Sequence, residues 1–150
     1  DIPAEAAPFD AESIREYVGA CYPAFELIDD RRADYATLDA ISMLADNIWC
    51  GGVILGPELT DWQDFDMAAT PVHLTWNGEK AGDSVTGAAM GSPMVSLAWL
   101  ANLAAERGWP MRKDMIVITG STLATKHPKP GDHAAYTIEG MGTVEVSIRA

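Results

Sequence analysis

One carboxylate of this chain stands inside an apolar run. Glu26 lies between Phe25 and Leu27, just before Arg31 and Arg32. Burying an unpaired carboxylate costs free energy, so the Glu26 side chain must either face solvent or meet a cation. An ion pair with one of the two arginines is, on general grounds, more common than a metal ligand. The spacing therefore identifies Glu26 as a candidate for chemistry and leaves its partner open.

A second group of polar residues, Gly120-Ser121-Thr122, follows a predicted strand. Glycine allows a close backbone approach there, and amides or hydroxyls can receive a substrate carboxylate. By itself this motif is weak evidence for a substrate site, since Gly-Ser sequences are common where a strand passes into a loop. The histidines have no second metal ligand at a suitable spacing in the sequence and no nucleophilic Ser or Cys to pair with. This favours surface positions for His73, His127 and His133. The chain has no nucleotide-binding fingerprint, which argues against nucleotide use.

The candidate residues need elements that position them. Residues 25–28 are predicted as a short strand in which Glu26 points to the face opposite its apolar neighbours, a geometry that can present a ligand to a cavity. Before it, Asp10 is expected to cap a helix with Ile14, Tyr17 and Val18 turned inward, ended by Gly19 and Pro23. Residues 53–55 are predicted as a second short strand, closed by Gly56-Pro57. Residues 32–44 have no clean period, so a loop or a short helix stays open.

Turn and cap signals organise the second half. Residues 72–76 alternate between apolar and polar and then meet Asn77-Gly78, the strongest hairpin signal in the chain. Ser92 is expected to cap, and Pro93 to open, a helix that covers a sheet and is stopped by Gly108 and Pro110. The predicted apolar face of this helix consists of Val95, Trp99, Leu100 and Leu103.

Two further strands complete the prediction. Residues 115–119 are expected to be a buried strand because of their length and β-branched content. Residues 144–149 alternate Val144, Val146 and Ile148 with polar residues, which predicts a half-exposed final strand. Many short strands, glycine turns and two helices predict an α+β domain with a rolled or barrel-like mixed sheet and outer helices.

Composition limits the classes of protein. The 150 residues, 48% of them hydrophobic, favour one domain with a real core. A formal net charge of -12 argues against nucleic acid and anionic membranes as partners. Cys21 and Cys50 match no zinc pattern and are predicted to be buried free thiols. No apolar run reaches membrane-spanning length and the first residues do not have the features of a signal peptide, so a cytoplasmic location is expected.

Several blocks together give the chain a family resemblance. They are the run around Glu26 (Ala-Phe-Glu-Leu-Ile-Asp-Asp-Arg), Ala45-Asp46-Asn47, the Gly87–Pro93 block, the helix around Trp99 and the Ile118–Ser121 step. The chain resembles the 2-oxopent-4-enoate hydratases and 4-oxalocrotonate decarboxylases of the fumarylacetoacetate hydrolase superfamily over nearly its whole length. The resemblance implies a mixed β-sandwich roll with helices packed outside. It also implies that residues 1–150 form a single catalytic domain that lacks its amino-terminal portion.

The resemblance also gives roles to residues. It implies that Glu26 is the third carboxylate of a metal site that holds Mg²⁺ or Mn²⁺. Relatives supply two further ligands from a Glu-x-Glu pair in the part that precedes this region, and this chain has no such pair. Gly120, Ser121 and Thr122 then stand at the rim of the substrate site.

Asp46 and Asn47 match a family Asp-Asn pair and become candidate catalytic residues. A turn in which they cap backbone amides is an equal alternative, and neither is assigned as general acid or base. Trp49 stands where relatives have a small side chain, so its indole is expected either to narrow the pocket or to stack on a conjugated substrate.

The function implied by the resemblance is a metal-dependent hydratase of aromatic catabolism, acting on a 2-hydroxypenta-2,4-dienoate-like acid. One alternative is a decarboxylase of the 4-oxalocrotonate type. Another is a noncatalytic fragment or subunit, because the carboxylates of the amino-terminal part have no substitute here. A homo-oligomer is expected, with a companion decarboxylase or the amino-terminal half as further partners, and the helix around Trp99 suits a homotypic contact.

Overall fold

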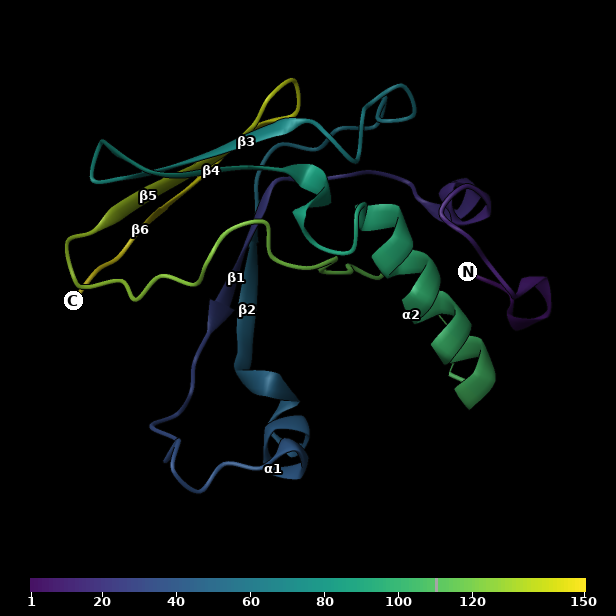
Figure 1. Ribbon diagram of the computed structural model, residues 1–150, viewed down its shortest axis with the longest axis horizontal. Helices are drawn as coiled ribbons and strands as arrows, with labels where there is room; N and C mark the ends of the chain where they lie inside the picture. The colour runs from purple at the N-terminus through teal and green to yellow at the C-terminus, as the bar shows by residue number, and fades with distance from the viewer. Residues whose placement is uncertain (110) are drawn as a thin grey trace.

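The chain folds into two antiparallel sheets flanked by one long helix (Figure 1). The computed structural model describes residues 1–109 and 111–150. The larger sheet has the strand order β4-β3-β5-β6 and the smaller one pairs β1 with β2. None of the described helices is both long and apolar enough to span a membrane.

The larger sheet consists of two hairpins. It contains β3 (Pro71–Trp76), β4 (Glu79–Val85), β5 (His133–Ile138) and β6 (Gly142–Ser147). The turn between β3 and β4 has left-handed backbone at Asn77 (φ 52°) and Gly78 (φ 82°), as a two-residue hairpin turn of Asn-Gly type requires. The predicted hairpin is therefore confirmed. The final strand is confirmed in part: Val144 is buried and Glu145 is exposed, but β6 ends at Ser147 and leaves out the predicted Ile148.

The described residues do not confirm the predicted rolled or barrel-like mixed sheet. All pairings between named strands are antiparallel, and neither sheet closes on itself. The four-stranded sheet has β4 and β6 at its open edges. The α+β class is correct, but the architecture is an open sheet with a separate two-stranded ribbon.

The two-stranded ribbon projects as an arm from the body of the molecule (Figure 1). It is formed by β1 (Ala24–Ile28) and β2 (Cys50–Leu55) and ends in α1 (Ala40–Ala45). These strands include the predicted strands 25–28 and 53–55, but the sequence did not predict that they pair. Asp39 caps α1 by accepting a hydrogen bond from the Ser42 amide at 2.7 Å. No residue of α1 is buried.

The long helix α2 (Pro93–Arg107) begins and ends as predicted. The Ser92 hydroxyl accepts a hydrogen bond from the Met94 amide, and Gly108 ends the helix with left-handed backbone (φ 67°). Pro110, the other predicted stop, lies outside the described residues.

The predicted buried face of α2 is wrong. Trp99 is 58% exposed, and Val95, Leu100 and Leu103 are only half-buried. The buried positions are instead Met94, Ala98, Ala101 and Ala104. Small side chains let this helix face approach the amino-terminal segment closely, so α2 packs mainly against that segment and shares the core with the larger sheet.

The amino-terminal segment is held by α2. Phe9 makes two backbone hydrogen bonds with the Asn102 side-chain amide, at 2.7 and 2.8 Å. The predicted helix after Asp10 is a 3₁₀ helix of five residues, Ser13–Tyr17. Ile14 is fully buried as expected, whereas Tyr17 is 36% exposed and the prediction of its inward position is wrong.

Residues 115–119 do not form the predicted buried strand. They have no strand assignment, and Met115 and Ile116 are 54% and 61% exposed. Their β-branched composition is that of a strand, but the described part of the chain offers them no strand partner.

The core lies between the larger sheet, α2 and the amino-terminal segment. Trp62, Ile14 and Val72 are among its most deeply buried side chains. Cys21 and Cys50 are free, as predicted, but half-buried rather than fully buried.

Candidate active site

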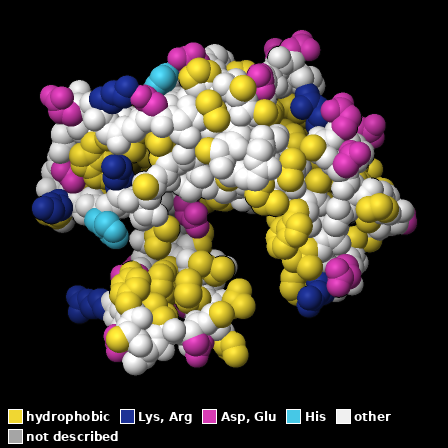
Figure 2. All heavy atoms as spheres, viewed as in Figure 1, with side chains coloured by type: hydrophobic (Ala, Val, Ile, Leu, Met, Phe, Trp, Pro, Cys, Tyr) yellow, Lys and Arg dark blue, Asp and Glu magenta, His cyan; other side chains and the backbone are white. Residues whose placement is uncertain are grey.

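A large open cavity separates the arm from the rest of the molecule. Its volume is about 1210 Å³, above the roughly 300–1,000 Å³ usual for small-molecule sites. Its walls come from β1, β5, the start of α2 and the segment 111–128. Figure 2 shows the hollow between the arm and the helix, with hydrophobic side chains on both of its sides.

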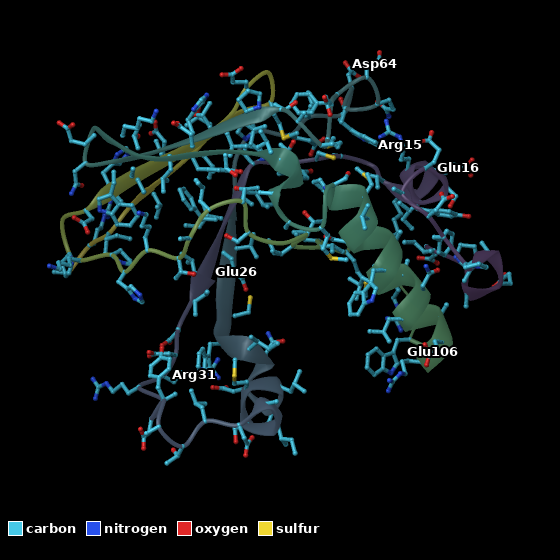
Figure 3. All side chains as sticks on the ribbon, viewed as in Figure 1. Arg15, Glu16, Glu26, Arg31, Asp64 and Glu106 are labelled. Atoms are coloured by element: carbon cyan, nitrogen blue, oxygen red, sulfur yellow. The ribbon has the colours of Figure 1, made fainter. Side chains whose placement is uncertain are left out.

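Glu26 lines this cavity from the middle of β1, where its backbone pairs with Val53. Its side chain is exposed and has no hydrogen bond or ion pair within the described residues. Arg31 instead pairs with Asp46, and Arg32 forms no ion pair there. The alternative of a Glu26 ion pair with either arginine is therefore wrong for this structure, and Figure 3 shows Arg31 farther out along the arm.

The described residues do not by themselves form a metal site. No group of three or more His, Cys, Asp or Glu side chains is arranged to hold an ion in residues 1–109 and 111–150. Divalent cations such as Mg²⁺ need several oxygen ligands, so one free carboxylate fits only part of such a site. Glu26 is therefore a candidate for one ligand of such a site.

The predicted rim residues do line the cavity. Gly120, Ser121 and Thr122 all contribute to its wall. Gly120 has φ +116°, and a Cβ on it would come within 2.7 Å of the Ala89 Cβ, so only glycine fits there without strain. The backbone amides of Ser121 and Thr122 have no acceptor among the described residues, which leaves them available to an anion.

Tyr136 is a cavity residue that sequence reasoning missed. It lies on β5, is 8% exposed, and its hydroxyl is 2.9 Å from Thr122 Oγ1. Its ring packs against Phe25 of β1 at a centroid distance of 6.0 Å. Burial raises the pKa of its phenol, so the hydroxyl is neutral near pH 7. The alternating pattern Ala134, Tyr136, Ile138 was the available signal for its inward position.

A second phenol in the cavity wall was also missed. The Tyr22 hydroxyl donates a hydrogen bond of 2.5 Å to Glu58, and this bond raises the pKa of Tyr22. Cys21, next in the chain and also in the wall, has its pKa raised to about 11 by burial. The Cys21 thiol is therefore protonated near pH 7 and is a poor nucleophile.

The other predicted site residues lie away from Glu26. Asp46, Asn47 and Trp49 are at the outer end of the arm and do not line the cavity. The Trp49 ring packs edge-on against Tyr35 at 5.6 Å, and Asp46 is held by Arg31. The structure does not bring these three residues together with Glu26, so their roles at the site stay predictions.

None of the three histidines is buried, as predicted, and one of them also lines the cavity. His73 lies on an exposed face, with Nδ1 2.9 Å from Asp83 Oδ1 and Nε2 2.8 Å from Glu139 Oε1. Its pKa is raised, and the hydrogen bond to Asp83 is the largest cause. His127 lines the cavity next to Lys126. Basic side chains therefore stand at this part of the rim of an otherwise acidic chain.

The fold and the cavity define an α+β domain with a large open cavity beside its two-stranded arm. Comparison with known proteins makes the class specific. The chain belongs to the fumarylacetoacetate hydrolase family, since residues 4–149 match the family described as Fumarylacetoacetate (FAA) hydrolase C-terminal. The predicted resemblance is confirmed.

Dienoate hydratases and oxalocrotonate decarboxylases are among the similar proteins. The chain is 32% identical over 137 residues to a 2-hydroxyhexa-2,4-dienoate hydratase of Comamonas testosteroni, covering 91% of this chain and 50% of that protein. It is 34% identical over 122 residues to a 4-oxalocrotonate decarboxylase of Pseudomonas putida, covering 81% of this chain and 46% of that protein.

A solved structure is also similar to this chain. The 4-oxalocrotonate decarboxylase from Pseudomonas putida G7, complexed with magnesium and adipate, superimposes with a TM-score of 0.84 at 29% identity. The match covers 92% of this chain and 52% of that one. The chain thus spans about half the length of the relatives that it matches.

Proposed function

We propose that this chain is the carboxy-terminal part of a hydro-lyase that adds water to a 2-hydroxypenta-2,4-dienoate-like acid. The observation that carries the proposal is the match to the family together with similarity to a 2-hydroxyhexa-2,4-dienoate hydratase over 91% of the chain. The cavity supports it, because an unpaired carboxylate and a rim with free amides face one space.

The chain's own residues have separate tasks in this proposal. The amides at Ser121 and Thr122 receive the substrate carboxylate, and the neutral phenol of Tyr136 keeps the rim in place through Thr122. The apolar walls accommodate the conjugated carbon chain and exclude bulk water from it. Glu26 supplies one carboxylate of a site for Mg²⁺ or Mn²⁺ that residues from outside this chain complete.

A decarboxylase of the 4-oxalocrotonate type is the second candidate. It is favoured by the structural match to such an enzyme in complex with magnesium and adipate. A noncatalytic fragment is the third, because the described residues do not complete a metal site. Assembly into a homo-oligomer, with or without a companion decarboxylase, belongs to the same proposal.

Turnover by the native polypeptide that contains this sequence tests the function. Intact mass spectrometry defines that polypeptide, which is then assayed with Mg²⁺ or Mn²⁺ on a 2-hydroxydienoate and on 4-oxalocrotonate. We expect a hydrated 4-hydroxy-2-oxo acid from the first substrate. Release of carbon dioxide from 4-oxalocrotonate as the faster reaction would contradict the hydratase.

Matched variants locate the chemistry. Glu26→Gln should lower kcat/KM about 100-fold or more, because the loss of a ligand costs at least as much as the loss of a residue that orients one. Glu145→Gln, an exposed carboxylate on β6, is the control and should keep full activity. Equal activity of the two variants would remove Glu26 from the site.

A further inference from the structure

Residues 115–119 have the composition of a strand and no strand to pair with. In the described part of the chain, residues 116–119 make no backbone hydrogen bond. Backbone donors and acceptors in folded proteins are almost always paired, and an exposed apolar edge invites pairing with another chain. The structure thus presents an unused set of hydrogen-bonding groups next to exposed apolar side chains.

Exposed apolar side chains of this segment and of the arm line the same cavity. Met115, Ile116 and Ile118 are 54%, 61% and 39% exposed, and all three line the cavity. On the arm, Leu27 and Ile28 line the same cavity and are 42% and 51% exposed. We call these five residues the open wall. Large apolar side chains gathered in the wall of one cavity mark a binding site more often than a solvent-facing region.

The size of the cavity points the same way. At about 1210 Å³ it is larger than the roughly 300–1,000 Å³ of ordinary ligand sites. A short dienoic acid is small even for such sites, so its binding leaves much of the open wall uncovered. An extended peptide segment fits the remaining space and supplies backbone partners.

The amino terminus of the chain lies beside the open wall. The Ile2 amide donates to the Met111 carbonyl at 2.9 Å, and the Lys113 amide donates to Asp1 Oδ1 at 2.7 Å. A polypeptide joined to Asp1 would therefore leave the domain next to residues 115–119. The relatives are about twice as long as this chain, so they have enough additional sequence for such a segment.

We infer that the open wall is a docking surface for an extended, apolar segment of the amino-terminal half of the full-length protein, which adds to residues 115–119 as a β-strand. This inference rests on the proposed function in one respect, namely that the chain is the carboxy-terminal part of a longer polypeptide. Docking closes one side of the cavity and leaves the rim at Gly120 facing the enclosed space.

Hydrogen exchange tests the inference. Amide exchange of residues 116–119 is measured by mass spectrometry in the 150-residue chain and in the native polypeptide that contains it. We expect unprotected exchange in the chain and at least about 100-fold slower exchange in the native polypeptide, as for paired strands. Amides of β3 serve as an internal control and should be protected in both.

Other outcomes overturn the inference. Protection in the 150-residue chain that grows with protein concentration would assign the open wall to a second copy. Protection that does not depend on concentration would show that the chain covers its own wall. Fast exchange in the native polypeptide, or a native mass equal to that of the 150-residue chain, would leave no such strand.

A pair of variants distinguishes a change in the docking surface from a general loss of stability. Ile116→Lys in the native polypeptide should abolish the protection of residues 117–119, because a charge then faces the docked strand. Ile41→Lys is the control, since Ile41 on α1 is 79% exposed and outside the cavity, and it should leave protection unchanged. Equal effects of the two variants would contradict the inference.

The two proposals can fail separately. Protection of residues 116–119 without dienoate turnover would refute the hydratase alone, and turnover without protection would refute the docked strand alone.

Discussion

Tyr136 of β5 and Thr122 of the cavity rim share a hydrogen bond of 2.9 Å between their hydroxyl groups. The phenol is buried and the threonine is half-buried, so each hydroxyl has little water to replace its partner. The bond ties an irregular segment to a strand of the larger sheet. It therefore fixes the position of the rim amides that we propose as the carboxylate site.

Removing this bond should loosen the rim. Tyr136→Phe should lower the free energy of unfolding by about 1 kcal/mol, the usual net value of a hydrogen bond. Thr122→Val should cost about 1–3 kcal/mol, because it leaves a buried phenol without a partner. Urea denaturation of both variants and of the double variant measures the effect, and the coupling energy isolates the bond.

The control for this cycle is an exposed hydroxyl pair. Thr137 and Thr143 share a hydrogen bond of 2.7 Å outside the cavity. Thr143→Val should change stability by less than about 0.5 kcal/mol, as surface substitutions usually do. A coupling energy near zero for Tyr136 and Thr122 would show that the bond does not hold the rim.

Gly120 is predicted to tolerate no side chain, for two separable reasons. Its φ of +116° strains any other residue, and a Cβ would lie 2.7 Å from the Ala89 Cβ. Gly131→Ala measures the first effect alone, since Gly131 has φ +95° and no atom within 4 Å of a built Cβ, and should cost about 1–3 kcal/mol.

Gly120→Ala should cost about 1–3 kcal/mol more than Gly131→Ala, because of the added overlap. Adding Ala89→Gly should recover the stability lost to the overlap with the Ala89 Cβ. It should leave the loss that comes from the strained backbone. Thermal or urea unfolding of the variants gives the comparison. Equal losses at positions 120 and 131 would mean that the contact with Ala89 relaxes without cost.

Local signals in the sequence predicted local structure well. Asn77-Gly78 specified the hairpin, and Ser92-Pro93 with Gly108 set both ends of α2. These residues act on the backbone within a few positions of themselves, so a single sequence is enough to interpret them.

Packing between segments far apart in the sequence could not be predicted from such local signals. The buried face of α2 consists largely of alanines, because the neighbouring segment approaches closely, and a search for large apolar residues selects the wrong face. Residues 115–119 have strand propensity, but propensity does not show whether a partner strand exists. The placement of Asp46 and Trp49 at the tip of the arm, away from Glu26, depends on the path of the whole ribbon.

His73 should make stability depend on pH. Its two ring nitrogens face Asp83 and Glu139, an arrangement in which both must donate, so the imidazolium is favoured and the pKa of His73 is raised above 6.5. A group with a raised pKa stabilises the fold fully below its unfolded pKa and loses that contribution as pH rises through its folded pKa. The melting temperature should therefore fall as pH is raised from about 6 upward.

The same contact acts in the opposite sense on Asp83. Its pKa is lowered by the hydrogen bond to His73, so its contribution is present above pH 3.8 and is lost as pH falls below that value. His73→Gln should remove the fall in melting temperature that accompanies rising pH. His133→Gln should leave this fall in place. A nuclear magnetic resonance titration of the His73 ring that showed no upward shift would contradict the prediction.

Metal binding by the 150-residue chain should be weak. Glu26 is the carboxylate that the family resemblance assigns to the ion, and the described residues do not form a group of three ligands around it. Since hard divalent cations need several oxygen ligands, calorimetry with Mn²⁺ should give a dissociation constant no tighter than about 0.1 mM. Glu26→Gln should weaken this binding further, and Glu79→Gln on β4 should not. Tight stoichiometric binding that Glu26→Gln abolishes, with no second polypeptide present, would show that the chain completes the site alone and would remove the physical reason for assigning the other ligands to an amino-terminal half.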